Sequence, residues 1–96
     1  MYAVVRTYAG QGAAELFDLI EASRSDVETL LRGVQGFHSY VLFRTTDGGV
    51  TVTVCADKSG ADESVRVARD WIRQNAAQLV TNPPTITEGP VLFELT

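Results

Sequence analysis

A chain of 96 residues with 45% hydrophobic and 21% charged side chains has the composition of one folded domain, which we take as residues 1–96, and this excludes a disordered or fibrous protein. A net charge of −4 with scattered basic residues argues against nucleic-acid binding, which needs a basic face. One cysteine and one histidine exclude an internal disulfide and a Cys/His zinc site, and no membrane-length apolar run occurs, so we expect a cytoplasmic protein without metal or cofactor.

The first predicted element is a strand over residues 2–8, rich in Val, Thr and Tyr and closed by the turn at residues 10–12. The Gly-Gln-Gly of this turn has the start of a dinucleotide-binding motif. We reject that motif because Glu15 replaces its third small residue and no parallel strand follows.

A helical region follows from residue 13, where apolar residues recur at three- and four-residue spacing: Leu16, Phe17, Ile20, Val27, Leu30, Leu31 and Val34. The apolar pattern is interrupted at residues 23–26. Ser25 and Glu28 have the spacing of a capping box, which starts a new helix. The sequence therefore predicts two helical pieces with a bend between them.

Two strands are predicted over residues 37–44 and 50–57, joined by a hairpin turn. Asp47-Gly48 favours this turn because both positions tolerate a positive φ. Val50, Val52 and Val54 alternate with two threonines and a cysteine, so the second strand has one aliphatic face and one moderately polar face.

The second helix is predicted over residues 59–80, with an apolar stripe formed by Ala61, Val65, Ala68, Ile72, Ala76 and Leu79. The prolines at 83 and 84 end it, since proline cannot continue a helix. Residues 85–95 are a final strand, and its Gly89-Pro90 step predicts a bend or an edge position.

The order βαββαβ predicts an α+β, ferredoxin-like fold, a four-stranded antiparallel sheet with both helices on one face. Because both parities of the central strands carry apolar residues, the sequence leaves open which face the helices cover. We expect Tyr2, Val4, Tyr40 and Leu42 on the bare face, more apolar surface than a small monomer exposes. A homodimer through this open face follows as an expectation.

Five segments carry a family resemblance: residues 1–6 (MYAVVR), 35–40 (QGFHSY), 52–59 (VTVCADKS), 70–73 (DWIR) and 84–89 (PTITEG). Together they resemble the antibiotic biosynthesis monooxygenase-like domains of the dimeric α/β-barrel superfamily. The resemblance implies a homodimer in which two sheets pack together, with a pocket between sheet and helices in each protomer.

The resemblance implies no single chemistry, because the superfamily includes cofactor-free oxygenases, haem-degrading enzymes, isomerases and dehydratases. Haem degradation is expected to use an Asn, a Trp and a His, for which this chain offers Asn75, Trp71 and His38. The expected histidine lies on a helix, whereas His38 lies on a predicted strand, and this departure argues against haem degradation.

Three residues are candidates for catalysis. Histidine is the residue type that usually serves as a general acid or base, so His38 is the natural candidate; the alternative is a histidine at the strand rim, bonded to backbone or solvent. Arg6, enclosed by the hydroxyls of Tyr8 and Tyr40, would bind a carboxylate, phenolate or enolate, with Tyr40 holding the anionic oxygen as well. Alternatively, Arg6 forms an inter-subunit salt bridge or reaches to solvent.

Tyr8, Phe17, Phe43 and Trp71 are candidates for ligand binding, the last three as an aromatic pocket wall. The alternative for Trp71 is packing at the border between helix and sheet. Cys55 is interpreted as a small buried hydrophobe, because no cationic neighbour in the sequence activates it as a thiol.

Two functional hypotheses remain. One is a dimeric module that binds a small organic metabolite. The other is a cofactor-independent monooxygenase or isomerase acting on an aromatic or enolisable substrate, in which Arg6 and Tyr40 hold an anionic oxygen and His38 moves a proton. The enzyme requires these three side chains in one cavity, whereas the module requires only a closed, apolar dimer.

Overall fold

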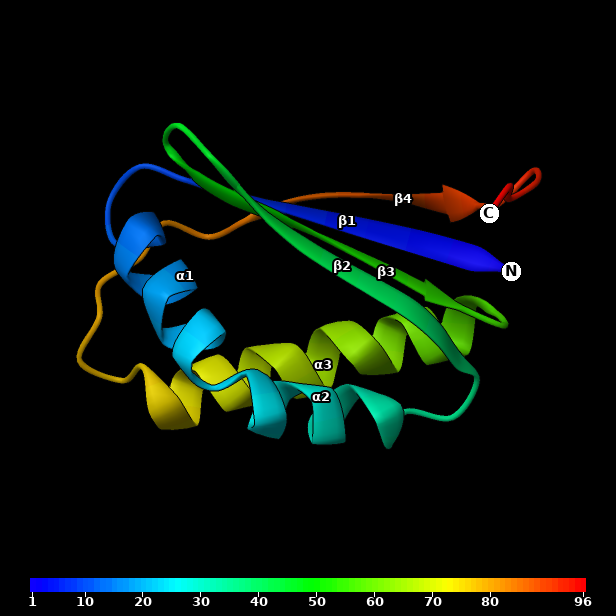
Figure 1. The fold of residues 1–96 in the computed structure, drawn as a ribbon, viewed down its shortest axis with the longest axis horizontal. Coiled ribbons are helices and arrows are strands. Elements are labelled where there is room, and N and C mark those ends of the chain that lie inside the picture. Colours follow the sequence, from blue (N-terminus) through cyan, green and yellow to red (C-terminus); the bar gives the residue numbers. More distant parts are fainter.

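The computed structural model describes residues 1–96. The elements are β1 (Tyr2–Ala9), α1 (Ala13–Ala22), α2 (Arg24–Arg32), β2 (Phe37–Thr45), β3 (Gly48–Cys55), α3 (Lys58–Asn75) and β4 (Thr85–Pro90). The strands form one antiparallel sheet in the order β2-β3-β1-β4. Figure 1 shows all three helices on one side of the sheet. The predicted ferredoxin-like fold is therefore confirmed.

The helical region after β1 is divided in two, as the interrupted apolar pattern predicts. Helix α1 ends and α2 begins around Ser23, whose φ of −106° and ψ of 26° are not helical. The predicted capping box is wrong, because α2 begins at Arg24 and Ser25 already lies inside its first turn. Glu28 pairs instead with Arg32, one turn further along the helix, at 3.5 Å.

The hairpin between β2 and β3 is tighter than predicted. Its two turn residues are Thr46 and Asp47, and Gly48 and Gly49 belong to β3. No non-glycine residue has a positive φ, and neither of these two glycines does. Both positions need glycine because a side chain would not fit: a Cβ at Gly48 would meet the Tyr8 carbonyl, and a Cβ at Gly49 would meet the Phe17 ring.

Two further predicted boundaries are wrong. Helix α3 ends at Asn75 rather than near residue 80, and the Asn75 side chain donates to the Trp71 carbonyl at 2.9 Å, as capping side chains do. Strand β4 ends at Pro90, which lacks an amide hydrogen, and residues 91–96 are not in a strand. Those residues leave the β4 edge and bring Glu94 to His38, near the start of β2 at the other edge of the sheet.

The helices cover the face of the sheet on which Val4 lies, a choice that the sequence left open. Val4 is 1% exposed, and Tyr2, Tyr40 and Leu42 share its side of the sheet, so the expectation that these four residues form the bare face is wrong. The open face carries the alternate positions of the strands: Ala3, Val5, Thr7, Ser39, Val41, Phe43, Val50, Val52, Val54, Thr85, Thr87 and Gly89. It is more aliphatic than the face that the helices cover.

The core between sheet and helices consists of two apolar clusters. One gathers Tyr8, Ala13, Leu16, Phe17, Ile20 and Ala76, and the other gathers Val4, Val34, Cys55 and Ala61. Between Val4 and Tyr8 on β1 lies Arg6, and the neighbouring inward positions of β3 are Thr51 and Thr53. A polar band on the sheet therefore separates the two clusters.

No helix of the chain is both long enough and apolar enough to cross a membrane.

Candidate functional site

Arg6 is the most unusual residue of the polar band. Its side chain is buried, at 4% exposure, and faces the helices. Nη1 donates to the Tyr8 hydroxyl at 3.2 Å, and the guanidinium lies 5.9 Å from the centre of the Tyr8 ring. The Nε atom is buried and has no acceptor, and no carboxylate pairs with the side chain. The alternatives of a solvent-reaching arginine and of a salt bridge across the open face do not fit this position.

A buried, unpaired charge is costly. Moving an ion out of water costs several kcal/mol even after relaxation, while a small domain is stable by only about 5–15 kcal/mol in total. A chain selected for stability alone would place an apolar residue at this position. The burial of Arg6 without a counter-charge therefore makes it a candidate for ligand binding.

Thr51 and Thr53 extend the polar band on β3. Thr51 pairs in register with Arg6 on one side and Leu42 on the other, and Thr53 pairs with Val4 and Tyr40. Both threonines are 1% exposed, and their Oγ1 atoms have no hydrogen-bond partner. Unsatisfied buried hydroxyls are rare in folded proteins, so these two threonines need a functional or solvent partner.

Tyr40 completes the band from β2. Burial raises the pKa of its phenol, and the positive charge of Arg6 opposes that rise. Two of the predicted catalytic residues, Arg6 and Tyr40, are therefore close enough to interact electrostatically. The phenol stays neutral at physiological pH and is available as a hydrogen-bond donor.

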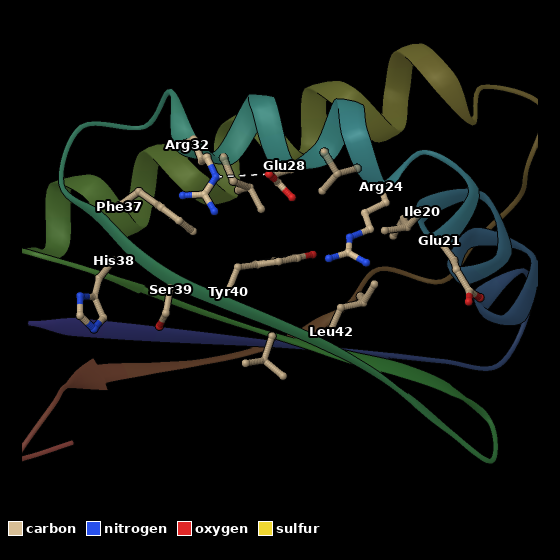
Figure 2. Close-up of a pocket in the computed structure, with 13 residues that line it drawn as sticks. Ile20, Glu21, Arg24, Glu28, Arg32, Phe37, His38, Ser39, Tyr40 and Leu42 are labelled. Atoms are coloured by element: carbon tan, nitrogen blue, oxygen red, sulfur yellow. Dashed lines mark ion pairs between the residues drawn. The ribbon is translucent and has the colours of Figure 1, made fainter. Parts of the chain in front are cut away.

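A cavity of about 650 Å³ opens between β2 and the first two helices. Its walls carry apolar residues and several charged ones: Ile20, Glu21, Arg24, Val27, Glu28, Leu31, Arg32, Phe37, His38, Ser39, Tyr40, Val41 and Leu42. In Figure 2, Arg24 reaches from the start of α2 and Tyr40 from β2 into the space between helix and strand. Both wall carboxylates are engaged, Glu21 with Arg44 and Glu28 with Arg32, which leaves Arg24 without a carboxylate partner.

A smaller chamber of about 20 Å³ lies deeper, against the polar band. Arg6, Tyr8, Thr51 and Trp71 line it together with four residues that also line the outer cavity: Ile20, Val27, Leu31 and Tyr40. Tyr40 is the polar member of the wall between the two spaces. The chamber holds about one water-sized group.

His38 does not join Arg6 and Tyr40. A bulge between Phe37 and Ser39 changes the alternation at the start of β2, and Figure 2 shows the imidazole pointing away from the Tyr40 phenol. His38 lies on the rim of the outer cavity, where Nε2 is 2.9 Å from Glu94 Oε1. The sequence offered no orienting carboxylate for this histidine; the structure supplies one from the C-terminal segment.

The four aromatic candidates have different surroundings. Tyr8 and Trp71 line the inner chamber, and Trp71 also packs against the first core cluster. Phe17 is 1% exposed and packs edge-on against Tyr8, with ring centres 5.8 Å apart. The expectation that Phe43 shares a wall with Phe17 and Trp71 is wrong, because β2 alternation places Phe43 on the open face, where it is 48% exposed.

Cys55 is fully buried in the second core cluster, as interpreted from the sequence. Burial raises the pKa of its thiol, and the charge of Asp57 raises it further. Both effects oppose thiolate formation. No group of three or more His, Cys, Asp and Glu side chains is arranged to hold a metal ion.

The sequence did not indicate three residues of the candidate site: Thr51, Thr53 and Arg24. Threonine is common in strands for its β-branched shape, so the two threonines gave no functional signal. The alternation with three valines could have marked them, had the covered face been known. Arg24 reaches the cavity only because the chain bends between α1 and α2.

The fold defines the class: a ferredoxin-like α+β protein, whose fold is shared by solved structures that are described as putative antibiotic biosynthesis monooxygenases. No family model matches the chain, and no curated protein matches it in sequence. The likeness is to solved structures, and at the identities found it concerns the fold.

Three such structures share the fold over nearly the whole chain. Rv0793 from Mycobacterium tuberculosis is 22% identical with a TM-score of 0.68, covering 99% of this chain and 98% of that one. The ActVA-Orf6 monooxygenase of Streptomyces coelicolor, solved with nanaomycin D, is 20% identical with a TM-score of 0.66, covering 99% and 89%. A dimeric ferredoxin-like protein from an uncultured marine organism is 15% identical with a TM-score of 0.66, covering 99% and 95%.

Proposed function

We propose that this chain binds a small organic molecule in the cavity between β2 and helices α1 and α2. The observation that carries the proposal is the cavity itself, of about 650 Å³, with mixed apolar and charged walls; the buried Arg6 lines the smaller chamber next to it. Binding sites for small molecules have volumes of about 300–1,000 Å³ and a few convergent polar groups in apolar walls. A molecule of one to three fused rings matches this space.

Binding is tested with the neutral fluorophore N-phenyl-1-naphthylamine, whose emission rises in apolar surroundings. We expect saturable fluorescence with the wild-type protein. Val27→Trp, which fills the wall shared by both spaces, should abolish the signal. Val80→Trp, at a residue that is 69% exposed and outside both cavities, is the matched control and should keep it. Equal fluorescence in both variants would place the probe elsewhere and contradict the proposal.

A second candidate function is catalysis: a cofactor-independent monooxygenase or isomerase acting on an aromatic or enolisable compound. The fold shared with the ActVA-Orf6 monooxygenase favours it. The position of His38, paired with Glu94 on the cavity rim, departs from the arrangement of three side chains in one cavity that this hypothesis requires. The test is oxygen uptake with dihydroxynaphthalenes. Uptake above the protein-free rate that His38→Ala abolishes, with folding unchanged, supports catalysis; uptake equal to the protein-free rate contradicts the oxygenase.

We also propose that two copies of the chain associate through the open face of the sheet. Val41 and Phe43 are 55% and 48% exposed there, next to the valines of β3. The C-terminal segment adds Leu92, Phe93 and Leu95, at 77% exposure or more. Contiguous apolar surface of this kind marks an interface in small proteins, and one structure with the same fold is described as dimeric.

A further inference from the structure

One side of the Arg6 guanidinium is unused. Of its nitrogens, Nη1 donates to Tyr8, whereas Nε is buried with no acceptor. The other residues that line the inner chamber are all neutral: Tyr8, Ile20, Val27, Leu30, Leu31, Tyr40, Thr51, Ala68, Trp71 and Ile72. Nothing in the chamber wall neutralises the positive charge, so an occupant with one negative charge would.

The unsatisfied hydroxyls of Thr51 and Thr53 also favour a negatively charged ligand. Thr51 lies directly across from Arg6 in the β1–β3 ladder, and Thr53 lies one inward position further along β3. Their Oγ1 atoms, like Nε of Arg6, are buried without partners. Three unsatisfied polar groups therefore occupy adjacent inward positions of the sheet. The two residues that line the chamber, Arg6 and Thr51, can each donate a hydrogen bond to an anionic oxygen there.

The volume of the chamber and the shape of the guanidinium limit which anionic groups can bind to Arg6. The chamber of about 20 Å³ has room for one oxygen atom of an anionic group, so the rest of that group must lie beyond the chamber, towards the outer cavity. The guanidinium fork matches the two oxygens of a carboxylate, and a single charge matches a monoanion. Because Tyr40 lines both spaces, a ligand that reaches Arg6 from the outer cavity has to pass its ring.

We infer that the ligand is an organic monocarboxylate, with one carboxylate oxygen at Nε of Arg6 and the Thr51 hydroxyl, and with its apolar body in the outer cavity. The inference rests on the proposed small-molecule binding and adds the charge and orientation of the ligand. It assigns Arg6 and Thr51 to recognition of the anionic group and leaves Val27, Leu31 and Leu42 to contact the body.

The test compares 2-naphthoate with its neutral isostere 2-naphthamide by isothermal titration calorimetry at pH 7. Wild-type protein should bind the carboxylate at least about tenfold more tightly, as expected for hydrogen bonds to a charged group. In Arg6→Met the ratio should fall to about one, because the partner charge is gone. Arg69→Met makes the same change at an exposed residue outside the cavities and should keep the wild-type ratio.

A stability measurement separates recognition from a structural role. Arg6→Met removes an unpaired buried charge, so its ligand-free Tm should equal or exceed that of the wild type. If this variant fails to fold, Arg6 is structural and the inference is overturned. Thr51→Val provides a second test: it should weaken 2-naphthoate several-fold and leave 2-naphthamide unchanged, because it removes only an unsatisfied hydroxyl.

The outcomes distinguish the inference from the proposed function. Equal affinity for the acid and the amide overturns the carboxylate inference while binding in the cavity stands. Absence of binding by both naphthalenes and by N-phenyl-1-naphthylamine overturns the proposed function, and the inference with it. Tight binding of the acid that survives Arg6→Met also overturns the inference.

Discussion

Burial and the charge of Arg6 have opposite effects on the pKa of Tyr40. Its phenol lies in the wall between the two cavities, where burial raises its pKa above 10.0 and Arg6 opposes the rise. A raised pKa means that the folded state holds the phenol proton more tightly than the unfolded state does. Its contribution to stability is therefore complete below pH 10.0 and is lost as the pH rises through the folded pKa.

We predict that Tyr40→Phe reduces the alkaline loss of stability. Urea unfolding measured between pH 8 and about pH 11 should show a fall in the free energy of unfolding that is shallower in the variant than in the wild type. Below pH 9 the two curves should run parallel, because the phenol is neutral in both states there. Parallel curves over the whole range would contradict a raised pKa at Tyr40.

Only part of the environment of Arg6 could be predicted from the sequence. Its alternation with Val4 and Tyr8 was visible in the sequence, and so was the idea of a cation near tyrosine hydroxyls. Whether it faced helices, a second sheet or solvent was not visible, since alternation gives relative and not absolute direction. The unsatisfied Nε and its threonine neighbours follow only from the register of β1 with β3.

The contact between α1 and β3 depends on Gly49. A Cβ at this residue would overlap the ring of Phe17, which is buried under Tyr8. The ring cannot withdraw far, because it belongs to the first core cluster. The glycine thus lets α1 approach the sheet.

We predict that Gly49→Ala destabilises the protein by about 1–3 kcal/mol, the usual cost of overpacking a core. Gly89→Ala is the matched control, because a Cβ there would meet nothing within 4 Å, and it should change the stability little. Chemical denaturation of both variants tests this difference. Equal stabilities would mean that Phe17 repacks freely.

Local sequence patterns were sufficient to predict some boundaries of helices and strands but not others. The division of the first helical region was predicted because the apolar repeat stops at residues 23–26. The hairpin was placed correctly but its turn was not, since Asp47-Gly48 suggested a positive-φ turn while Gly48 and Gly49 serve the packing against β1 and α1. Propensity cannot separate these two uses of glycine.

At the scale of the whole molecule, the aliphatic open face is the surface through which we propose that two copies associate. Val52 lies at its centre, paired with Val5 on β1 and Val41 on β2. Burying these side chains against a second copy would gain roughly 25 cal/mol per Å² of apolar surface removed from water.

We predict that, in sedimentation equilibrium, the wild-type protein will be a dimer and the Val52→Glu variant a monomer. A charge at the centre of an apolar interface would have to be buried without a partner, which opposes association. Val80→Glu introduces the same charge at an exposed residue off the sheet and should leave the dimer intact. A wild-type monomer at high concentration, or a dimeric Val52→Glu variant, would contradict association through this face.

The sequence by itself determined the order of elements, the antiparallel sheet and the division of β3 into an aliphatic and a moderately polar face, because these depend on local periodicity and chain connectivity. Tertiary structure alone decided which face the helices cover, which residues meet across the strands and where the cavities lie. Arg6, Thr51 and Tyr40 come from three strands, and only sheet register brings them together. His38 was separated from them by a bulge, a feature that no residue pattern in β2 predicts.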